Sequence, residues 1–334
     1  MDGGVLERAG ELAAGPLEGV GLGREAALEL AALAAEDLWA VIYWANRIRR
    51  RWRGDRVHLC GIVAAKVGRC TEDCQWCSPS GRYASTVAAR GLLGEEELAG
   101  AARSAAEAGA NCFGFVTSGA GPTAEELDRL CAAYSQVRED GRLAACASLG
   151  KIDEATARQL GAAGCRRYNH NLESSRRHYG RVVTTHTFDE RLATARAVKA
   201  AGLELCSGGL FGMGETVEDR VDLALELRAV GADIVPVNFL RPMAGTPLAD
   251  ARPLEPREGL AIIALLRFML PQQCINIAGG RELCLRDLQS WMFHAGADGC
   301  LLGDYLTYGG RAAAEDLRMI DDLGLTPESA ATAD

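Results

Sequence analysis

The run Gly68-Arg-Cys-Thr-Glu-Asp-Cys-Gln-Trp-Cys77 follows the β-like segment Val57–Ala64, and the rest of the chain is organised around it. The thiols of Cys70, Cys74 and Cys77 can bind three corners of one cubic iron–sulfur cluster. The run contains no fourth cysteine, so one iron of such a cluster stays open. An open iron beside a small-molecule site predicts chemistry at this loop and not merely structural support.

A structural zinc site is the alternative interpretation of the same three thiols. Zinc normally takes a fourth Cys or His close to the other ligands. The nearest candidates are His58 and Cys60 before the run and Cys112 after it. The spacing therefore favours a 4Fe–4S cluster over zinc.

Short β-like segments alternate with helical segments from residue 57 onward. We expect eight strands, at Val57–Ala64, Cys112–Thr117, Leu143–Ser148, Cys165–Asn169, Glu204–Leu210, Ile234–Asn238, Cys274–Ala278 and Gly299–Leu302. We expect helices between them, near residues 95–109, 123–137, 153–163, 188–201, 216–230, 255–269 and 281–295. This alternation predicts an α/β fold, a closed parallel (β/α)8 barrel of the TIM type; a doubly wound open sheet is the alternative. Functional groups of such a barrel lie at the C-terminal ends of its strands, where the cysteine loop follows the first strand.

The predicted domain organisation has one barrel with short additions at both ends. The additions are an N-terminal helical extension over residues 1–54 and a C-terminal tail over residues 326–334, and the barrel spans residues 55–325. Apolar residues at helical spacing predict a helix pair within residues 24–53, preceded by a lead-in with one short helix. A single α/β barrel commonly occupies a chain of 334 residues.

The composition excludes several classes of function. A net charge of −9 argues against a nucleic-acid groove as the main surface. No apolar run is long enough for a membrane span, and the first 23 residues lack a signal-peptide pattern. Twelve cysteines in a long chain suit reduced thiols kept for metal clusters better than a secreted disulfide scaffold. We therefore expect a cytoplasmic protein that binds neither nucleic acid nor membrane.

The Cys-x-x-x-Cys-x-x-Cys spacing resembles that of radical S-adenosylmethionine (SAM) enzymes, in which the open iron chelates SAM. Over most of the chain, from Val57 to Leu323, the sequence also resembles biotin synthase. Seven segments carry that resemblance in the right order: Ala64-Ala-Lys-Val-Gly-Arg-Cys-Thr-Glu-Asp-Cys74, Tyr168-Asn-His-Asn-Leu-Glu173, Thr184-Thr-His-Thr-Phe-Asp-Glu-Arg191, Cys206-Ser-Gly-Gly-Leu-Phe-Gly-Met-Gly-Glu215, Val235-Pro-Val-Asn-Phe239, Gly245-Thr-Pro-Leu248 and Ala278-Gly-Gly-Arg-Glu282.

The resemblance implies sulfur insertion into dethiobiotin to give biotin. An electron from a flavodoxin or ferredoxin would reduce the 4Fe–4S cluster, which would cleave SAM to a 5′-deoxyadenosyl radical. That radical would take hydrogen from dethiobiotin, and an auxiliary iron–sulfur cluster would supply the sulfur. Such chemistry needs the reacting groups held in contact and water excluded, and it demands no proton-transfer residue. We also expect a homodimer.

The resemblance implies six residues that contact SAM, namely Trp76, Asn171, Glu173, Arg191, Gly208 and Gly209. Trp76 would lie near the adenine, and Arg191 would bind the carboxylate of the cofactor through charge-assisted hydrogen bonds. Asn171 and Glu173 alternate at a strand end, so both point into the barrel, and Glu173 is one methylene longer than the usual Asp. The two glycines would let the backbone approach the cofactor closely.

The resemblance also implies a substrate site. Asn171 and Asn238 match residues that bind the ureido group of dethiobiotin, and Lys66 belongs to the same predicted site. Asn238 ends an apolar strand, where its amide needs a polar partner.

The typical family member holds its auxiliary 2Fe–2S cluster with three cysteines and one arginine, and this chain departs from that pattern. Two cysteines match, Cys146 and Cys206, but the third falls at Gly114 and the arginine at Asn276. On that comparison alone, half of the auxiliary ligands are missing.

Strand periodicity offers replacements for the missing ligands. Cys112 and Cys274 each lie two residues before a vacated position, and residues two apart share one face of a strand. We therefore predict auxiliary ligation by Cys112, Cys146, Cys206 and Cys274, with Cys60 as a possible further ligand. Four thiolates favour a four-iron cluster, which a branch of the family is thought to use with an extra sulfide. Buried free cysteines without ligand function are the alternative, and the same interpretation covers Cys131, Cys165, Cys284 and Cys300.

Two rival functions remain at this stage. One is a biotin-synthase-like radical SAM enzyme with another small substrate, such as the maturases and mutases of hydrogenase assembly and pyrrolysine synthesis. The other is a non-catalytic iron–sulfur or zinc-binding protein, which would not cleave SAM.

Overall fold

Nine parallel strands form a closed barrel in the computed structural model, which describes residues 3–85 and 87–329. The strands are β1 (Arg56–Lys66), β2 (Cys112–Thr117), β3 (Ala144–Ser148), β4 (Arg167–Asn169), β5 (Glu204–Cys206), β6 (Gly209–Phe211), β7 (Ile234–Phe239), β8 (Cys274–Ile277) and β9 (Gly299–Leu301). They pair in chain order, with β6 beside β7, and pairing of β1 with β9 closes the ring. The predicted (β/α)8 barrel is confirmed, and the open sheet is excluded.

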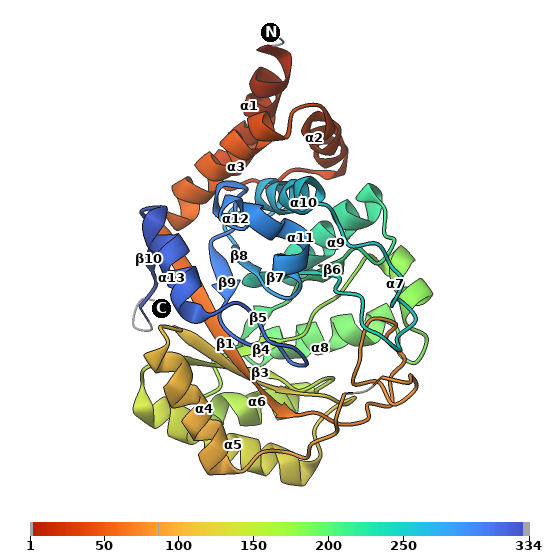
Figure 1. Ribbon diagram of the computed structural model, residues 1–334, viewed down its shortest axis with the longest axis vertical. Coiled ribbons are helices and arrows are strands. Elements are labelled where there is room, and N and C mark those ends of the chain that lie inside the picture. Colours follow the sequence, from red (N-terminus) through yellow and green to blue (C-terminus); the bar gives the residue numbers. More distant parts are fainter. Residues whose placement is uncertain (1–2, 86, 330–334) are drawn as a thin grey trace.

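Helices surround the barrel, as Figure 1 shows. They are α4 (Glu95–Glu107), α5 (Ala124–Asp140), α6 (Glu154–Ala163), α7 (Arg176–Val182), α8 (Phe188–Ala200), α9 (Val217–Val230), α10 (Pro256–Met269), α11 (Arg281–Leu285), α12 (Trp291–His294) and α13 (Ala313–Asp322). The predicted helix near 281–295 is interrupted, because Arg286 has a φ of 49° and begins a short 3-10 turn between α11 and α12. The short α7 and the late α13 lie outside the predicted helices.

The predicted fifth strand, Glu204–Leu210, is split into β5 and β6 by close contact with β7. A Cβ atom on Gly208 would lie 1.9 Å from the carbonyl oxygen of Pro236. Pro236 has no backbone N–H to donate, so the hydrogen-bond ladder is interrupted at this level. Pairing resumes between Gly209 and Val237, and the two short strands together occupy one place in the barrel.

Three helices precede β1, and a short strand follows α13. They are α1 (Gly3–Leu17), α2 (Arg24–Glu36), α3 (Leu38–Arg53) and β10 (Thr326–Pro327). Asp37 caps the N-terminus of α3, because its side chain accepts hydrogen bonds from the backbone N–H groups of Trp39 and Ala40. β10 pairs with the start of β1, so the first residues of the predicted tail lie on the barrel, while residues 330–334 lie outside the described residues.

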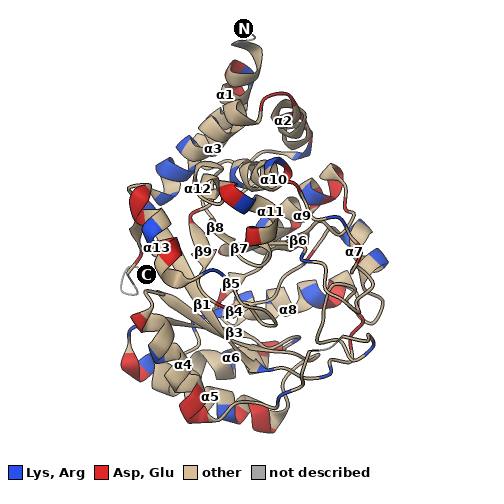
Figure 2. Cartoon of the chain, viewed as in Figure 1, with Lys and Arg blue, Asp and Glu red and all other residues tan. Residues whose placement is uncertain are grey.

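The apolar core lies between the helices and the barrel wall. Charged residues lie mainly on the outer helices, whereas the strands in the centre are mostly uncharged (Figure 2). Among the described residues, no helix is both long and apolar enough to cross a membrane.

Candidate active site

Cys70, Cys74 and Cys77 line one wall of a cavity of about 240 Å³ at the C-terminal end of the barrel. All three thiols are free of disulfide bonds. Burial raises the pKa of Cys74 and of Cys77 to about 12, so each remains protonated until a metal replaces its proton. The predicted cluster ligands therefore share one site.

An unpartnered imidazole faces the same cavity. His170 lines it, is only 6% exposed, and its Nε2 atom has no hydrogen-bond partner among the described residues. Burial lowers the pKa of His170 well below its usual value, so the ring is neutral. A buried nitrogen of this kind calls for a ligand in the cavity, and three thiols beside it fit a 4Fe–4S cluster with SAM on the open iron.

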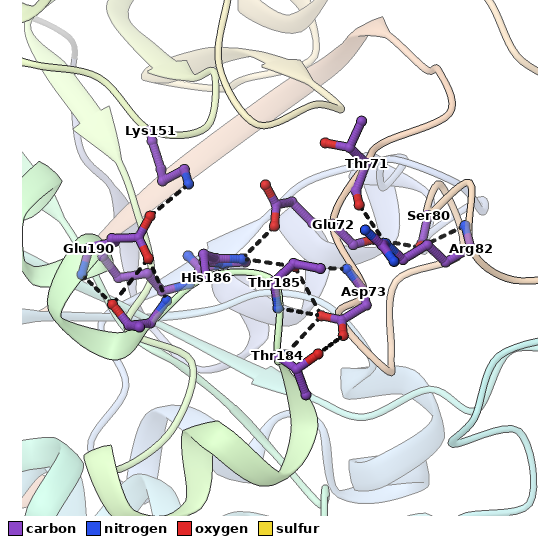
Figure 3. Close-up of polar contacts among 12 residues, drawn as sticks. Thr71, Glu72, Asp73, Ser80, Arg82, Lys151, Thr184, Thr185, His186 and Glu190 are labelled. Atoms are coloured by element: carbon purple, nitrogen blue, oxygen red, sulfur yellow. Dashed lines mark hydrogen bonds and ion pairs between the residues drawn. The ribbon is translucent and has the colours of Figure 1, made fainter.

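The two acidic residues between the first cysteines anchor the loop to the segment before α8 (Figure 3). Asp73 accepts hydrogen bonds from the backbone N–H of Thr184 at 2.9 Å and of Thr185 at 3.1 Å, and from both hydroxyl groups. Glu72 accepts a hydrogen bond from Nδ1 of His186 at 2.7 Å. The position of the cysteines is thus set by contacts far along the chain.

A chain of hydrogen bonds continues from this anchor to Arg191. The Nε2 atom of His186 accepts from the Tyr179 hydroxyl at 2.8 Å, and the same hydroxyl oxygen accepts from Nε of Arg191 at 2.7 Å. Arg191 also donates to the carbonyl oxygen of Asn171 at 2.7 Å and lies 3.9 Å from the Glu173 carboxylate. The fixed guanidinium lines the cysteine cavity, where a carboxylate can bind.

Glu173 and Asn171 lie together beside Arg191 and line both this cavity and a second one. Glu173 has a φ of 68°, an unusual value for a residue other than glycine. Burial raises the pKa of the Glu173 carboxyl, although Arg191 opposes this shift. Such strain and desolvation are typical of a ligand-binding position.

The second cavity, of about 340 Å³, continues from the first into the barrel. Trp76 and Cys77 line both cavities, so the site formed by Cys70, Cys74 and Cys77 adjoins the barrel interior. Asn238 lines the second cavity, and its Oδ1 atom accepts from the backbone N–H of Gly279 at 2.9 Å while its Nδ2 atom donates to the Gly209 carbonyl at 3.4 Å. Its amide is therefore held at the cavity wall.

Three further residues of the predicted site are not among the residues that line the two cavities, although Gly208 donates its backbone N–H to Oδ1 of Asn171 at 3.2 Å. Gly208 and Gly209 line neither cavity as described, and the close approach that they allow is to Pro236 and to Leu223. Lys66 is also absent from both described linings, and its Nζ atom pairs with Glu126 at 2.6 Å.

A group of thiols forms the inner end of the second cavity. Cys60, Cys146 and Cys206 line it from β1, β3 and β5. Cys112 on β2 lies directly beside Cys60 in the strand register and packs with Cys146. Hydrogen bonds with Cys146 and Cys60 hold the pKa of Cys112 well below its usual value.

Cys274 contacts one member of this thiol group, Cys206. It packs with Cys206 and Ile234, yet it is not among the described residues that line either cavity. Burial raises its pKa well above the usual value, and its nearest charged groups include Asp298 and Arg53. The two-residue displacement on β8 thus places this thiol on the inner face but at a different level from Cys60, Cys112 and Cys146.

The sequence analysis missed Arg167. This arginine on β4 is 5% exposed, and its Nη1 atom donates to the Cys112 sulfur at 3.1 Å. The alternation that placed Asn171 on the inner face also places Asn169 and Arg167 there. This alternation is the sequence pattern from which the inward position of Arg167 could be predicted.

Comparisons with known proteins agree with this geometry. The Radical SAM superfamily model matches residues 66–227, and the Biotin and Thiamin Synthesis associated domain matches residues 236–326. The barrel, the cysteine loop and the first of these matches make the protein a radical SAM enzyme.

The nearer relatives define the family. The chain is 50% identical over 290 residues to a biotin synthase of Syntrophotalea carbinolica, covering 86% of this chain and 88% of the relative. It is 48% identical over 315 residues to a biotin synthase of Trichlorobacter lovleyi, covering 94% and 95%. The chain belongs to the biotin synthase family.

Solved structures share the fold at lower identity. Methylornithine synthase superposes with a TM-score of 0.84 at 23% identity, covering 96% of this chain and 98% of that chain. The FeFe-hydrogenase maturase of Carboxydothermus hydrogenoformans gives a TM-score of 0.81 at 19% identity, covering 97% and 80%. These likenesses show the fold alone.

Proposed function

We propose that this protein converts dethiobiotin to biotin by radical SAM chemistry, with sulfur supplied from an auxiliary iron–sulfur cluster in the barrel. The single observation that carries the proposal is the second thiol group at the inner end of a cavity continuous with the Cys70–Cys77 site. These thiols can hold the auxiliary cluster that supplies sulfur beside the radical site. Family membership supports the same substrate.

The residues of the two cavities suit the parts of this reaction. When bound, SAM on the open iron supplies hydrogen-atom abstraction, and the auxiliary cluster supplies sulfur. Arg191 binds the SAM carboxylate, and Glu173 with Asn171 lies where the cofactor and the substrate meet. Asn238 presents its amide to the ureido group. Apolar side chains of the second cavity, among them Val116 and Leu210, exclude water from the radical.

The proposed auxiliary ligands are Cys60, Cys112, Cys146 and Cys206. Cys60 packs with Cys112 and Cys146, and it lines the second cavity together with Cys146 and Cys206, which supports Cys60 as the fourth thiolate. Cys274 packs with Cys206 but lines neither cavity. Four thiolates can hold either cluster type, and we propose the four-iron form because this ligand set departs from the three cysteines and one arginine of the typical 2Fe–2S site.

The remaining parts of the proposal concern partners. A flavodoxin or ferredoxin supplies the electron, and the reduced thiols suit the cytoplasm. A homodimer is supported by exposed aromatic side chains on α3 and α12. Trp39 and Trp291 are 41% and 39% exposed, and their rings are 4.8 Å apart.

The test is turnover of dethiobiotin by anaerobically reconstituted protein with SAM and reduced flavodoxin, read by mass spectrometry. We expect biotin, 5′-deoxyadenosine and methionine, and none of these from the Cys74→Ser variant. SAM cleavage without biotin would favour a radical enzyme with another substrate. Zinc instead of iron on metal analysis, with no SAM cleavage, would favour a non-catalytic metal-binding protein.

A further inference from the structure

A buried arginine contacts the auxiliary thiol group from β4. Arg167 lies between β3 and β5, level with Cys146 on one side and Glu204 on the other. Its Nη1 atom donates to the sulfur of Cys112 at 3.1 Å and lies 3.4 Å from Nε2 of His58. One edge of the guanidinium is thus directed at the thiol group.

The other edge of the guanidinium is fixed. Nε and Nη2 of Arg167 both donate to Oε2 of Glu204, at 2.9 and 2.6 Å. Arg166 donates to the other carboxylate oxygen of Glu204 at 2.8 Å. Two arginines therefore bind one glutamate, and Nη1 of Arg167 remains directed at the Cys112 sulfur.

His58 supports the same arrangement. Its Nδ1 atom lies 3.2 Å from the carboxylate of Glu328, and one ring nitrogen lies within 4.8 Å of the sulfurs of both Cys60 and Cys112. A carboxylate on one side of an imidazole fixes the orientation of its other nitrogen. The thiol group is therefore surrounded by an ordered set of polar side chains.

The position that carries arginine in the typical family member offers no charge here. Asn276 on β8 is 5% exposed, and its Oδ1 atom has no partner among the described residues. Of the described residues that line the second cavity, Arg241 is the one cation, and it lies over the Tyr308 ring at 4.8 Å. Four thiolates around an iron–sulfur cube leave a net negative charge, which a buried site must balance.

We propose that Arg167 is the arginine of the auxiliary-cluster site in this chain, a positioning residue that hydrogen bonds the Cys112 thiolate and balances the charge of the cluster. β4 thus supplies an arginine that hydrogen bonds a cluster ligand, whereas the typical family member supplies an arginine ligand from β8. The inference rests on the proposed function, because it requires an auxiliary cluster in the second cavity.

The test compares Arg167→Met, Arg167→Lys and Arg166→Met in anaerobically reconstituted protein. Arg166 is the matched control, since it adjoins Arg167 and binds the same glutamate. The readouts are iron and sulfide content and the midpoint potential of each cluster, followed by electron paramagnetic resonance during a redox titration. Hydrogen bonds and positive charge at cluster sulfurs make reduction easier.

We expect Arg167→Met to shift the auxiliary potential to more negative values, Arg167→Lys to restore part of the shift, and Arg166→Met to leave the potential unchanged. The potential of the Cys70–Cys77 cluster should stay constant in all three. The inference is overturned if Arg167→Met and Arg167→Lys keep the wild-type potential, or if Arg166→Met shifts it equally. If Arg167→Met retains no auxiliary iron, the test rests on Arg167→Lys: a shifted auxiliary potential supports the inference, and the wild-type potential overturns it. Wild-type protein without an auxiliary cluster would instead contradict the proposed function.

Discussion

The anchor at Asp73 gives a quantitative prediction. Hydrogen bonds from Thr184 and Thr185 outweigh the opposing effect of burial and lower the pKa of Asp73 from 3.8 to about 2. A shift of this size corresponds to about 2.4 kcal/mol at full value, since one pKa unit is 1.36 kcal/mol. Because much of the carboxylate is open to water, screening reduces the stabilisation to about 1–2 kcal/mol.

Asp73→Asn removes the charge and keeps the shape. We expect amide hydrogen exchange to become about 5- to 30-fold faster in residues 70–77 and 183–187, because local opening costs that much less. The assay is exchange mass spectrometry on reduced, metal-free protein. Asp37→Asn is the control, since Asp37 also accepts two backbone N–H groups but lies between α2 and α3. Unchanged exchange in both segments of Asp73→Asn would show that this carboxylate does not anchor the cysteine loop.

The same carboxylate predicts a pH dependence. Its pKa in the folded protein, about 2, lies below the ordinary value of 3.8. The stabilisation is therefore complete above the ordinary pKa and is lost as the pH falls from about 4 to about 2. In Asp73→Asn, exchange of the two segments should lose this dependence.

Three further predictions test other parts of the site. Gly208→Ala should lower the free energy of unfolding, measured by urea denaturation, by about 3 kcal/mol or more, because its Cβ would lie 1.9 Å from the Pro236 carbonyl oxygen. The control Gly100→Ala in α4 should not destabilise the protein, because its Cβ would have no contact nearer than 3.7 Å. Arg191→Lys should weaken SAM binding about 10- to 100-fold by equilibrium dialysis, because a lysine cannot reproduce the guanidinium fork, and the exposed Arg196→Lys on the same helix should bind normally. Asn238→Ala should raise KM for dethiobiotin about tenfold through loss of one hydrogen bond, with the SAM dissociation constant unchanged; equal changes in both would contradict its assignment to the substrate.

The sequence could predict the barrel because each strand–helix unit is a local pattern, and closure follows from their regular number. It could also place Cys70, Asn171 and Arg191 near one another, because all three follow strands whose C-terminal ends meet at one rim. The split at Gly208 could not be predicted, because its cause is Pro236 on a neighbouring strand. The interruption at Arg286 is a backbone feature with no helix-breaking residue type to signal it.

The auxiliary thiols show a further limit of sequence patterns. Strand periodicity identifies the face of a residue but not its level along the barrel axis, which depends on how the strands are staggered. Cys112 lies level with Cys60, whereas Cys274 packs behind Cys206, near Asp298 and Arg53, and does not line the cavity. Alternation with Asn169 indicates that Arg167 points inward, but its contact with Cys112 on another strand is not visible in the local sequence.

The central claim is that sulfur carried inside the barrel enters the product. The most direct measurement is a single turnover in which the protein is reconstituted with heavy-isotope sulfide, freed of excess sulfide, and given SAM, reduced flavodoxin and dethiobiotin. We expect biotin that carries the heavy sulfur in wild-type protein and no labelled biotin in Cys112→Ser, which should keep the Cys70–Cys77 cluster. Biotin without the label, or labelled biotin from Cys112→Ser at the wild-type yield, would contradict the central claim.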